Sequence, residues 1–329
     1  MLDKATVLTT IFTLVDDVMK GSRVIQEILD RPGPTPRLSD SEVVTMALYQ
    51  ERIAEPREDH FFRLHQEQWR GYFPGLNERS RYNRRKRDLW FVILAVRMSL
   101  QIVLDALLLE ETAVIDSAPV PCVGDKRGKQ ASDFVGRAEY GVCSSKALKY
   151  FGLKLPTMVS LTGVVMGFLL TPANRYDKQP VVELLDAFSH HLKRLLGEGA
   201  YNDAALQSFL EQDRSVQLLA PTKANQEPQR SREVQRQLNR LRLICETVNA
   251  QLQEPLHLSK HYAKSSWGLL TRMAAKLTAH SVAMMVNQLL GRPLLRLADL
   301  ALSLICQGGT RTKRTRSHRD QSEKAAVSE

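Results

Sequence analysis

The stretch "TAVIDSAPVP", residues 112–121, contains the most informative acid of the chain. A short apolar run, residues 113–115, leads directly into Asp116 and predicts a buried strand. Pro119 and Pro121 lack the amide hydrogen that a central strand needs, so we expect the strand to end near Asp116. An acid in this place is either an ordinary turn residue or one member of a group of carboxylates.

Residues 110–290 show a mixture of strand and helix signals. Two apolar runs between residues 150 and 173 flank Thr162–Gly163, which predicts two antiparallel strands joined by a turn. A further apolar run ends at Glu198 and predicts a fourth strand. The order strand, strand, strand, helix, strand, helix, strand, helix predicts a mixed α/β sheet flanked by helices. The expected helices cover residues 176–196, 203–213, 231–254 and 265–290, and the last strand covers 215–221.

Residues 1–108 have the apolar spacing of helices. Ser39 or Ser41 precedes one helical segment, and Glu42 stands three residues after Ser39, as in a capping box. We therefore divide the chain into a helical region, an α/β domain, and a helix remnant with a basic tail. Their boundaries are 1–108, 109–292 and 293–329.

The composition favours a polyanionic partner. The chain has 329 residues, 43% of them hydrophobic, and a net charge of +10. Such a charge is typical of proteins that bind nucleic acid or, second, a membrane surface. No apolar run approaches the ~18 residues of a membrane-spanning helix, so no membrane segment is expected. Asp16 and Asp17 interrupt the N-terminal apolar stretch and no small-residue cleavage site is evident, so a signal peptide is not expected either. The cysteines form no C-x-x-C pair, which indicates free thiols in a reducing compartment, the cytoplasm. His257 and His261 are spaced like two metal ligands, but no third ligand is near, so zinc is not expected.

Six of the nine residues from Arg79 to Arg87 are Arg or Lys. Such a run is either a solvated helix face or a surface whose cations contact DNA phosphates and release counterions. Residues 309–329 are also basic and lack a core pattern, so we expect a disordered arm that attracts DNA. The expected phosphate contacts are Arg79, Arg81, Arg84, Arg85, Lys86, Arg87, Lys149 and Lys154.

Three acids stand at places that a folded sheet can bring together. Asp116 and Glu198 follow apolar runs, and Glu246 lies on the flank of the apolar stripe of a long helix. Simpler explanations exist, since Glu198 suits a turn between glycines and Glu246 suits a surface pair with Arg242. Together, however, they offer the hard carboxylate ligands that Mg²⁺ takes, and two ions about 3.5–4 Å apart assist phosphodiester cleavage.

Four motifs occur in the order, and at roughly the spacing, of a bacterial insertion-sequence transposase. They are "AVIDSAPVP", "YFGLKLP", "GEGAYND" and "ICETVNAQL". The segments "LSDSEVVTMAL" and "YFPGLNERSRYNRRKRDL" are similar to the leading region of the same proteins. Over residues 35–292 the chain thus resembles the DDE class of transposases, and it is most similar to the insertion sequence 982 group. The resemblance implies an RNase H-like catalytic domain in 109–292, preceded by a DNA-binding helical region in 1–108.

The resemblance also implies the roles of the acids. Asp116 matches the first acid of the DDE triad, and Glu246 matches the last. The second acid belongs to a Gly-Asp-x-x-Tyr pattern, which here is Gly197-Glu198-Gly199-Ala200-Tyr201, so Glu198 stands where the family has aspartate. Asp203 is a possible substitute ligand, although the register favours Glu198.

The function implied by the resemblance is DNA transposition. A transposase of this class binds double-stranded DNA at terminal inverted repeats and at a target, and it works as a homo-oligomer on DNA. It nicks DNA with two Mg²⁺ ions, for which Mn²⁺ substitutes, and the freed 3′-OH attacks the target strand. The alternative is a DNA-binding remnant whose catalysis is impaired by Glu198. A third reading is a related nuclease that cleaves without strand transfer.

Overall fold

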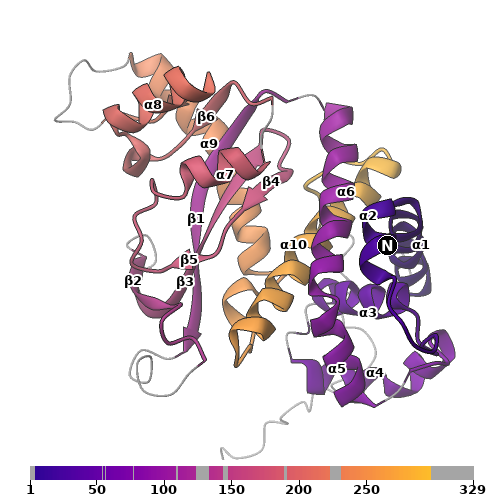
Figure 1. Cartoon of the computed structure of the whole chain (residues 1–329). Coiled ribbons are helices and arrows are strands. Elements are labelled where there is room, and N and C mark those ends of the chain that lie inside the picture. The colour runs from indigo at the N-terminus through magenta and orange to yellow at the C-terminus, as the bar shows by residue number, and fades with distance from the viewer. Residues whose placement is uncertain are drawn as a thin grey trace, which may run out of the picture.

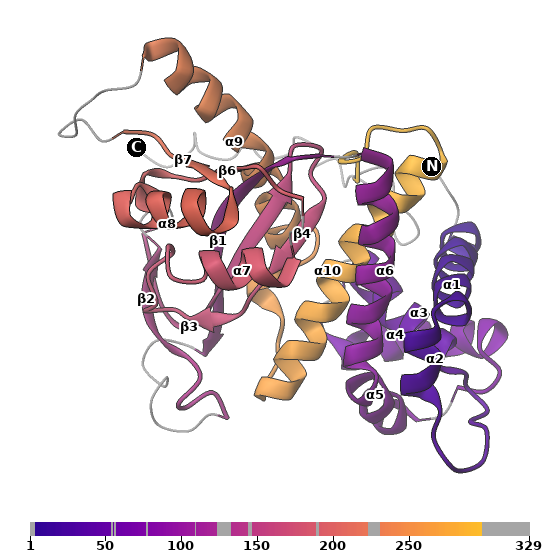
Figure 2. The same ribbon diagram turned by 45° about the horizontal axis from the view of Figure 1, so that its top comes forward.

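The computed structural model shows a group of helices beside a mixed β-sheet, with the long helix α10 (Ser266–Leu289) running between them (Figures 1 and 2). The structure describes residues 4–53, 55, 57–76, 78–108, 110–123, 133–143, 147–188, 191–222 and 231–297. The predictions for the basic tail and for Cys306 lie outside these residues.

The N-terminal region is helical, as the sequence predicts. The expected capping box is present at the start of α3, where the Ser39 hydroxyl accepts a 3.2 Å hydrogen bond from the amide of Glu42 and the Glu42 carboxylate accepts one of 2.5 Å from the amide of Ser39. The helices are α1 (Lys4–Gly21), α2 (Arg23–Leu29), α3 (Asp40–Arg52), α4 (Glu58–Tyr72), α5 (Arg79–Asp88) and α6 (Trp90–Leu108).

The sheet has the order β2-β3-β1-β6-β7, with β4 and β5 also paired to β3. β1 is antiparallel to β3 but parallel to β6, and β6 is parallel to β7. This mixed sheet with flanking helices is consistent with the RNase H-like α/β fold that the sequence predicts. The strands are β1 (Thr112–Val123), β2 (Glu139–Cys143), β3 (Leu148–Ser160), β4 (Val165–Phe168), β5 (Thr171–Pro172), β6 (Arg194–Leu196) and β7 (Gln217–Leu219).

The two faces of the sheet pack against different helices. Ala113 and Ile115 of β1 belong to a core cluster with residues of α7 (Val181–Phe188) and α8 (Ala204–Arg214). Val114 and Ala118 belong to a larger cluster that includes residues of α9 (Arg232–Gln253), of α10 and of the N-terminal helices. Because side chains alternate across a strand, Asp116 shares the face of Val114, which is the α9 side.

The structure differs from the expected strands and helices in three places. β1 does not end at Asp116 but continues to Val123, through both prolines. Beyond Val114 its pairing to β6 has ended, so it has the antiparallel β3 as its remaining partner, and a proline is tolerated where one edge of a strand is unpaired. β2 is not among the strands that the sequence pattern predicts. The helix expected over 176–196 is shorter, since α7 ends at Phe188 and β6 begins at Arg194.

The expected turn between β3 and β4 is confirmed, and the expected apolar stripe of α9 is confirmed in part. The β3–β4 turn contains Gly163 with a φ of +93°, a left-handed conformation that favours glycine. The apolar stripe expected in α9 consists of Val234, Leu238, Leu241, Val248 and Leu252. Of these, Leu238, Val248 and Leu252 are buried, whereas Val234 and Leu241 are exposed. Buried Cys245 takes a place in the stripe that the sequence pattern did not assign.

Helix α6 is a core helix with one exposed apolar side. Within the described residues it is the one helix long and apolar enough to cross a membrane by length and composition, which the sequence reading did not anticipate. It packs against α10, and its buried Arg97 donates a 2.6 Å hydrogen bond to the carbonyl of Val165 in β4. The Arg97 guanidinium also lies over the Phe168 ring, 5.1 Å from its centroid. These contacts join the helical region directly to the sheet.

Candidate active site and basic surfaces

Asp116 and Glu198 are brought side by side by the parallel pairing of β1 with β6. In that register Val114 is level with Leu196. Asp116 and Glu198 stand two residues further along each chain, so the register places the two acids next to each other on the α9 side of the sheet. The proximity is also electrostatic, since the charge of Glu198 raises the pKa of Asp116.

The Asp116 carboxylate is partly buried and accepts two hydrogen bonds. Oδ1 accepts one of 2.7 Å from the amide of Ser117, and Oδ2 accepts one of 2.9 Å from the side-chain amide of Asn249. Burial raises the pKa of Asp116 to about 6, helped by the charges of Glu198 and Asp177 and opposed by the two hydrogen bonds. A bound cation stabilises the ionised form of a desolvated carboxylate that lies beside other acids. Carboxylates with a raised pKa in such surroundings are common at functional sites.

Glu198 is held in place by its backbone and by Arg242. Its carbonyl accepts a 2.8 Å hydrogen bond from the amide of Tyr201, which closes the short 3₁₀ helix η3 (Gly199–Tyr201). Gly197 is required by packing, because an added Cβ would lie 2.7 Å from Cβ of Tyr201. The carboxylate of Glu198 accepts a hydrogen bond from Nη2 of Arg242 in α9.

Arg242, Glu246 and Asn249 lie about one turn apart along α9, so they share one side of the helix. Besides binding Glu198, Nη2 of Arg242 lies 4.0 Å from Oε1 of Glu246. Glu246 is the most exposed of the predicted acids, with 56% of its side chain accessible. The three predicted acids therefore lie around one side of α9, where Arg242 links Glu198 to Glu246 and Asn249 contacts Asp116.

The donor atoms at this place fit Mg²⁺ in kind. Asp116, Glu198 and Glu246 supply carboxylate oxygens, and Oδ1 of Asn249 is buried with no hydrogen-bond partner among the described residues. In the arrangement seen, however, no three acid, histidine or cysteine side chains within the described residues converge closely enough to hold a metal ion. Arg242 accounts for part of this, because its guanidinium engages both glutamates.

The alternative ligands have other partners. Asp203 caps α8 by accepting a 3.0 Å hydrogen bond from the amide of Leu206, and it pairs with Lys178. Asp203 therefore stabilises the start of α8 in this structure. A ring nitrogen of His261 lies 3.0 Å from the carbonyl of Pro121, and burial lowers the pKa of His261 to about 4.

The basic cluster of α5 divides into buried and exposed members. Lys86 is buried and pairs with Glu58, so it supports the helix packing rather than facing a ligand. Arg85 donates to the carbonyl of Leu38 and to the carboxylate of Asp40. Arg79, Arg81 and Arg84 are exposed, and Arg87 is half-buried. The surface that remains for a polyanion is thus smaller than the sequence predicts.

The two lysines of β3 also differ from each other. Lys154 donates to the carbonyl of Arg175 at 3.2 Å and pairs with Asp177 at 3.0 Å, so its charge is compensated within the protein. Lys149 is exposed.

The fold and these acids define a class: an RNase H-like domain with acids grouped on one side of its central strand. The comparison with known families agrees, because residues 108–266 match the family described as "Transposase DDE domain". This part of the chain is therefore a transposase DDE domain. Neither the curated proteins nor the solved structures contain a significant match.

Sequence reasoning missed Asn249 and treated Arg242 only as a partner of Glu246. A signal was present, since positions 242, 246 and 249 are spaced by four and three residues and so fall on one side of a helix. Asp177 was also missed, because it lies in the segment between β5 and α7 and reaches the site only through the fold.

Proposed function

We propose that the chain is an insertion-sequence transposase, most similar to the 982 group, that binds element-end DNA and cleaves it in a metal-dependent reaction before strand transfer. The observation that carries the proposal is the meeting of Asp116, Glu198 and the acidic side of α9 within a transposase DDE domain. We also propose the division into a helical DNA-binding region (1–108), a catalytic domain (109–292) and a basic tail (293–329), acting in the bacterial cytoplasm.

The residues would act as follows. Asp116, Glu198 and Glu246 hold divalent metal, and Asn249 orients Asp116 through its side-chain amide. When bound, two Mg²⁺ ions, or Mn²⁺ in their place, activate the attacking oxygen and stabilise the leaving oxygen of a phosphodiester. The buried setting of Asp116 excludes water from one side of the site, so that its charge acts with less screening.

DNA is the proposed partner because the chain is strongly basic and the family acts on DNA. The exposed cations of α5, namely Arg79, Arg81 and Arg84, together with Lys149 of β3, supply phosphate contacts. Arg85, Lys86 and Lys154 are not carried into this interface, because each is engaged inside the protein. Strand transfer joins two DNA segments, so a homo-oligomer on DNA is expected.

A second candidate is a DNA-binding protein with impaired catalysis. The observation that favours it is the pairing of Glu198 with Arg242, because a side chain held by an arginine is less available to a metal ion. Glu198 also stands where the family has aspartate, and a Mg²⁺ site tolerates poorly a carboxylate shifted by one methylene.

One assay separates the two. The protein is incubated with DNA that contains the element's ends, with Mg²⁺ or Mn²⁺, and the products are mapped. Nicks at the element's end, absent without metal, support the transposase. Specific binding without nicks under any metal supports the impaired protein.

A further inference from the structure

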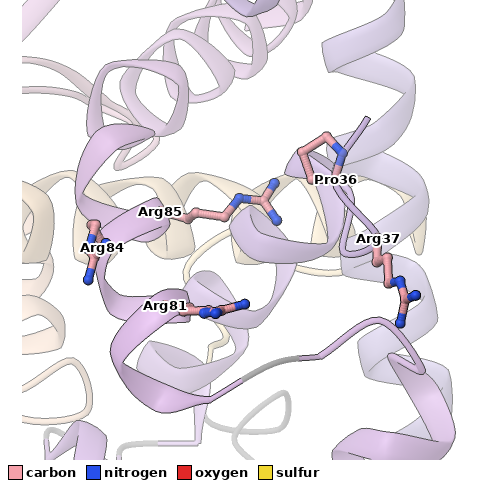
Figure 3. A pocket seen from close by; sticks show the side chains of 5 residues that line it. All are labelled: Pro36, Arg37, Arg81, Arg84 and Arg85. Carbon is pink, nitrogen blue, oxygen red and sulfur yellow. The ribbon is translucent and has the colours of Figure 1, made fainter. Parts of the chain in front are cut away.

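A cavity of about 600 Å³ lies between α5 and the segment before α3 (Figure 3). Its lining consists of Pro36, Arg37, Arg81, Arg84 and Arg85. Arg81 and Arg85 extend from α5 toward the segment that carries Pro36 and Arg37 (Figure 3). Four arginines from two parts of the sequence thus line one space, and Arg37 lies outside the basic run of α5.

Three contacts fix the two sides of the pocket relative to each other. Arg85 donates a 2.5 Å hydrogen bond to the carbonyl of Leu38 and one of 2.6 Å to the Asp40 carboxylate. Leu38 itself is buried. Gly75, in the connection between α4 and α5, touches the backbone of Arg37 so closely that an added Cβ would collide with it.

The charge of the pocket is largely uncompensated. Asp40 is the one acid that contacts a lining arginine among the described residues, and it is shared between Arg85 and Arg31, which lies 2.8 Å away. Arg37, Arg81 and Arg84 make no ion pair within the described part of the chain. Arginine side chains that line one space without a paired acid repel each other, and an anion bound there relieves that repulsion.

We propose that this pocket binds the phosphates of a DNA backbone, with Arg37, Arg81 and Arg84 as the contacts and Arg85 as the residue that positions the Arg37 segment. The inference rests on the proposed function and names the site through which the helical region holds DNA. Guanidinium groups bind phosphate oxygens through paired hydrogen bonds, and four of them with one shared carboxylate match a ligand of repeated negative charge. A cavity of this size accepts more than a single phosphate, in keeping with a strand of sugar and phosphate.

The test compares two double variants that each remove two positive charges. Arg37→Gln/Arg81→Gln removes contacts from both sides of the pocket, whereas Arg63→Gln/Arg70→Gln removes the same charge from exposed positions of α4, outside the pocket lining and the proposed phosphate contacts. Binding of a short fluorescein-labelled duplex of arbitrary sequence is measured by anisotropy at several salt concentrations. We expect the pocket variant to flatten the plot of log affinity against log salt by about two units, since each phosphate contact contributes about 0.9. The control variant is expected to change the slope by less than half as much.

A third variant tests geometry without changing charge. Gly75→Ala pushes the Arg37 segment away from α5, so it should also weaken duplex binding at constant net charge. Circular dichroism and thermal unfolding identify a Gly75→Ala protein that fails to fold, and in that case the pocket variant decides the question.

The outcomes separate the pocket from the wider proposal. If the wild type binds duplex and both double variants lose affinity equally, the pocket is not a phosphate site, while DNA binding stands. If the wild type binds no duplex, but inorganic pyrophosphate raises its unfolding temperature and the pocket variant abolishes that effect, the source of the phosphate is a free anion. That result overturns the DNA assignment of the pocket and the proposed function with it.

Discussion

The side-chain amide of Asn249 donates a 2.9 Å hydrogen bond to Oδ2 of Asp116 and so ties α9 to the middle of β1. This contact, rather than one from Glu246, is the direct link between the late helix and the first acid. It also leaves Oδ1 of Asn249 buried and without a partner among the described residues. Asn249 is thus placed to orient Asp116.

Replacing Asn249 should raise the pKa of Asp116 above its value of about 6. The hydrogen bond from Asn249 stabilises the ionised carboxylate, so its loss in Asn249→Ala favours the protonated form. Asn249→Asp should raise the pKa further by adding a like charge. Carbon NMR titration of the carboxyl group in metal-free protein measures both shifts. Thr247→Ala, on the exposed side of α9, serves as the control, and a shift of equal size there would contradict the assignment.

Asp116→Asn and Glu246→Gln should abolish DNA cleavage while leaving DNA affinity nearly unchanged. The reason is that each change removes a proposed metal ligand, whereas binding rests on arginines and lysines elsewhere. Nicking of element-end DNA and anisotropy of the same DNA measure the two properties. Asp203→Ala is a control: it should lower stability by roughly 1 kcal/mol through loss of a helix cap but retain nicking. Wild-type nicking by either ligand variant would remove that residue from the site.

Glu198→Asp should increase cleavage with Mg²⁺. The shorter side chain restores the acid expected in the family and withdraws from Arg242, which now holds the Glu198 carboxylate. Because a displacement of about 1 Å in a catalytic group costs on the order of a hundredfold in rate, the gain should be large. Rates of wild type, Glu198→Asp and Glu198→Ala are compared side by side. A fast wild type with a slower aspartate variant would show that the site is adapted to glutamate, and an unchanged alanine variant would exclude Glu198 as a ligand.

Deleting residues 309–329 should flatten the salt dependence of DNA binding without changing sequence preference. The segment is basic, and phosphate contacts contribute to the slope but carry no sequence information. Affinity for element-end and unrelated duplexes is measured across a salt series in both proteins. Loss of the preference for element ends on truncation would show instead that the tail contacts bases.

Acidification should destabilise the protein through His280. This side chain is fully buried, a ring nitrogen lies 3.0 Å from Oε1 of Gln251, and burial lowers the pKa of His280 from 6.5 to about 3. Above pH 6.5 its contribution to stability is fully present, because neither the folded nor the unfolded state binds the proton. As the pH falls from 6.5 toward about 3, the unfolded state binds a proton that the folded state does not. The free energy of unfolding should therefore fall by about 1.4 kcal/mol per pH unit for this group.

His280→Gln isolates this effect. The free energy of unfolding is measured with urea at a series of pH values. In the variant, the part of its pH dependence that comes from His280 should be lost. The part that comes from His261, whose pKa is lowered to about 4, should remain. The difference between the two proteins should be constant above pH 7. Parallel pH profiles down to pH 4 would show that His280 is accessible to protons in the folded state.

Much of this protein follows from its sequence alone. The apolar run 113–115 predicts the buried strand that carries Asp116, the capping box at Ser39 starts α3, and the order of strands and helices predicts the mixed sheet. These features depend on neighbours within a few residues, and local propensity and periodicity report on such neighbours directly.

The tertiary structure alone decides which side chains meet. The β1–β6 register sets Asp116 beside Glu198, and α9 presents Arg242 and Asn249 to them. The same is true of Lys86, which a basic run predicts to be exposed but which pairs with Glu58 in the interior. Arg37 joins the arginines of α5 only because α3 and α5 pack together. Contacts between residues far apart in the chain depend on how whole elements pack, and no local pattern encodes that packing.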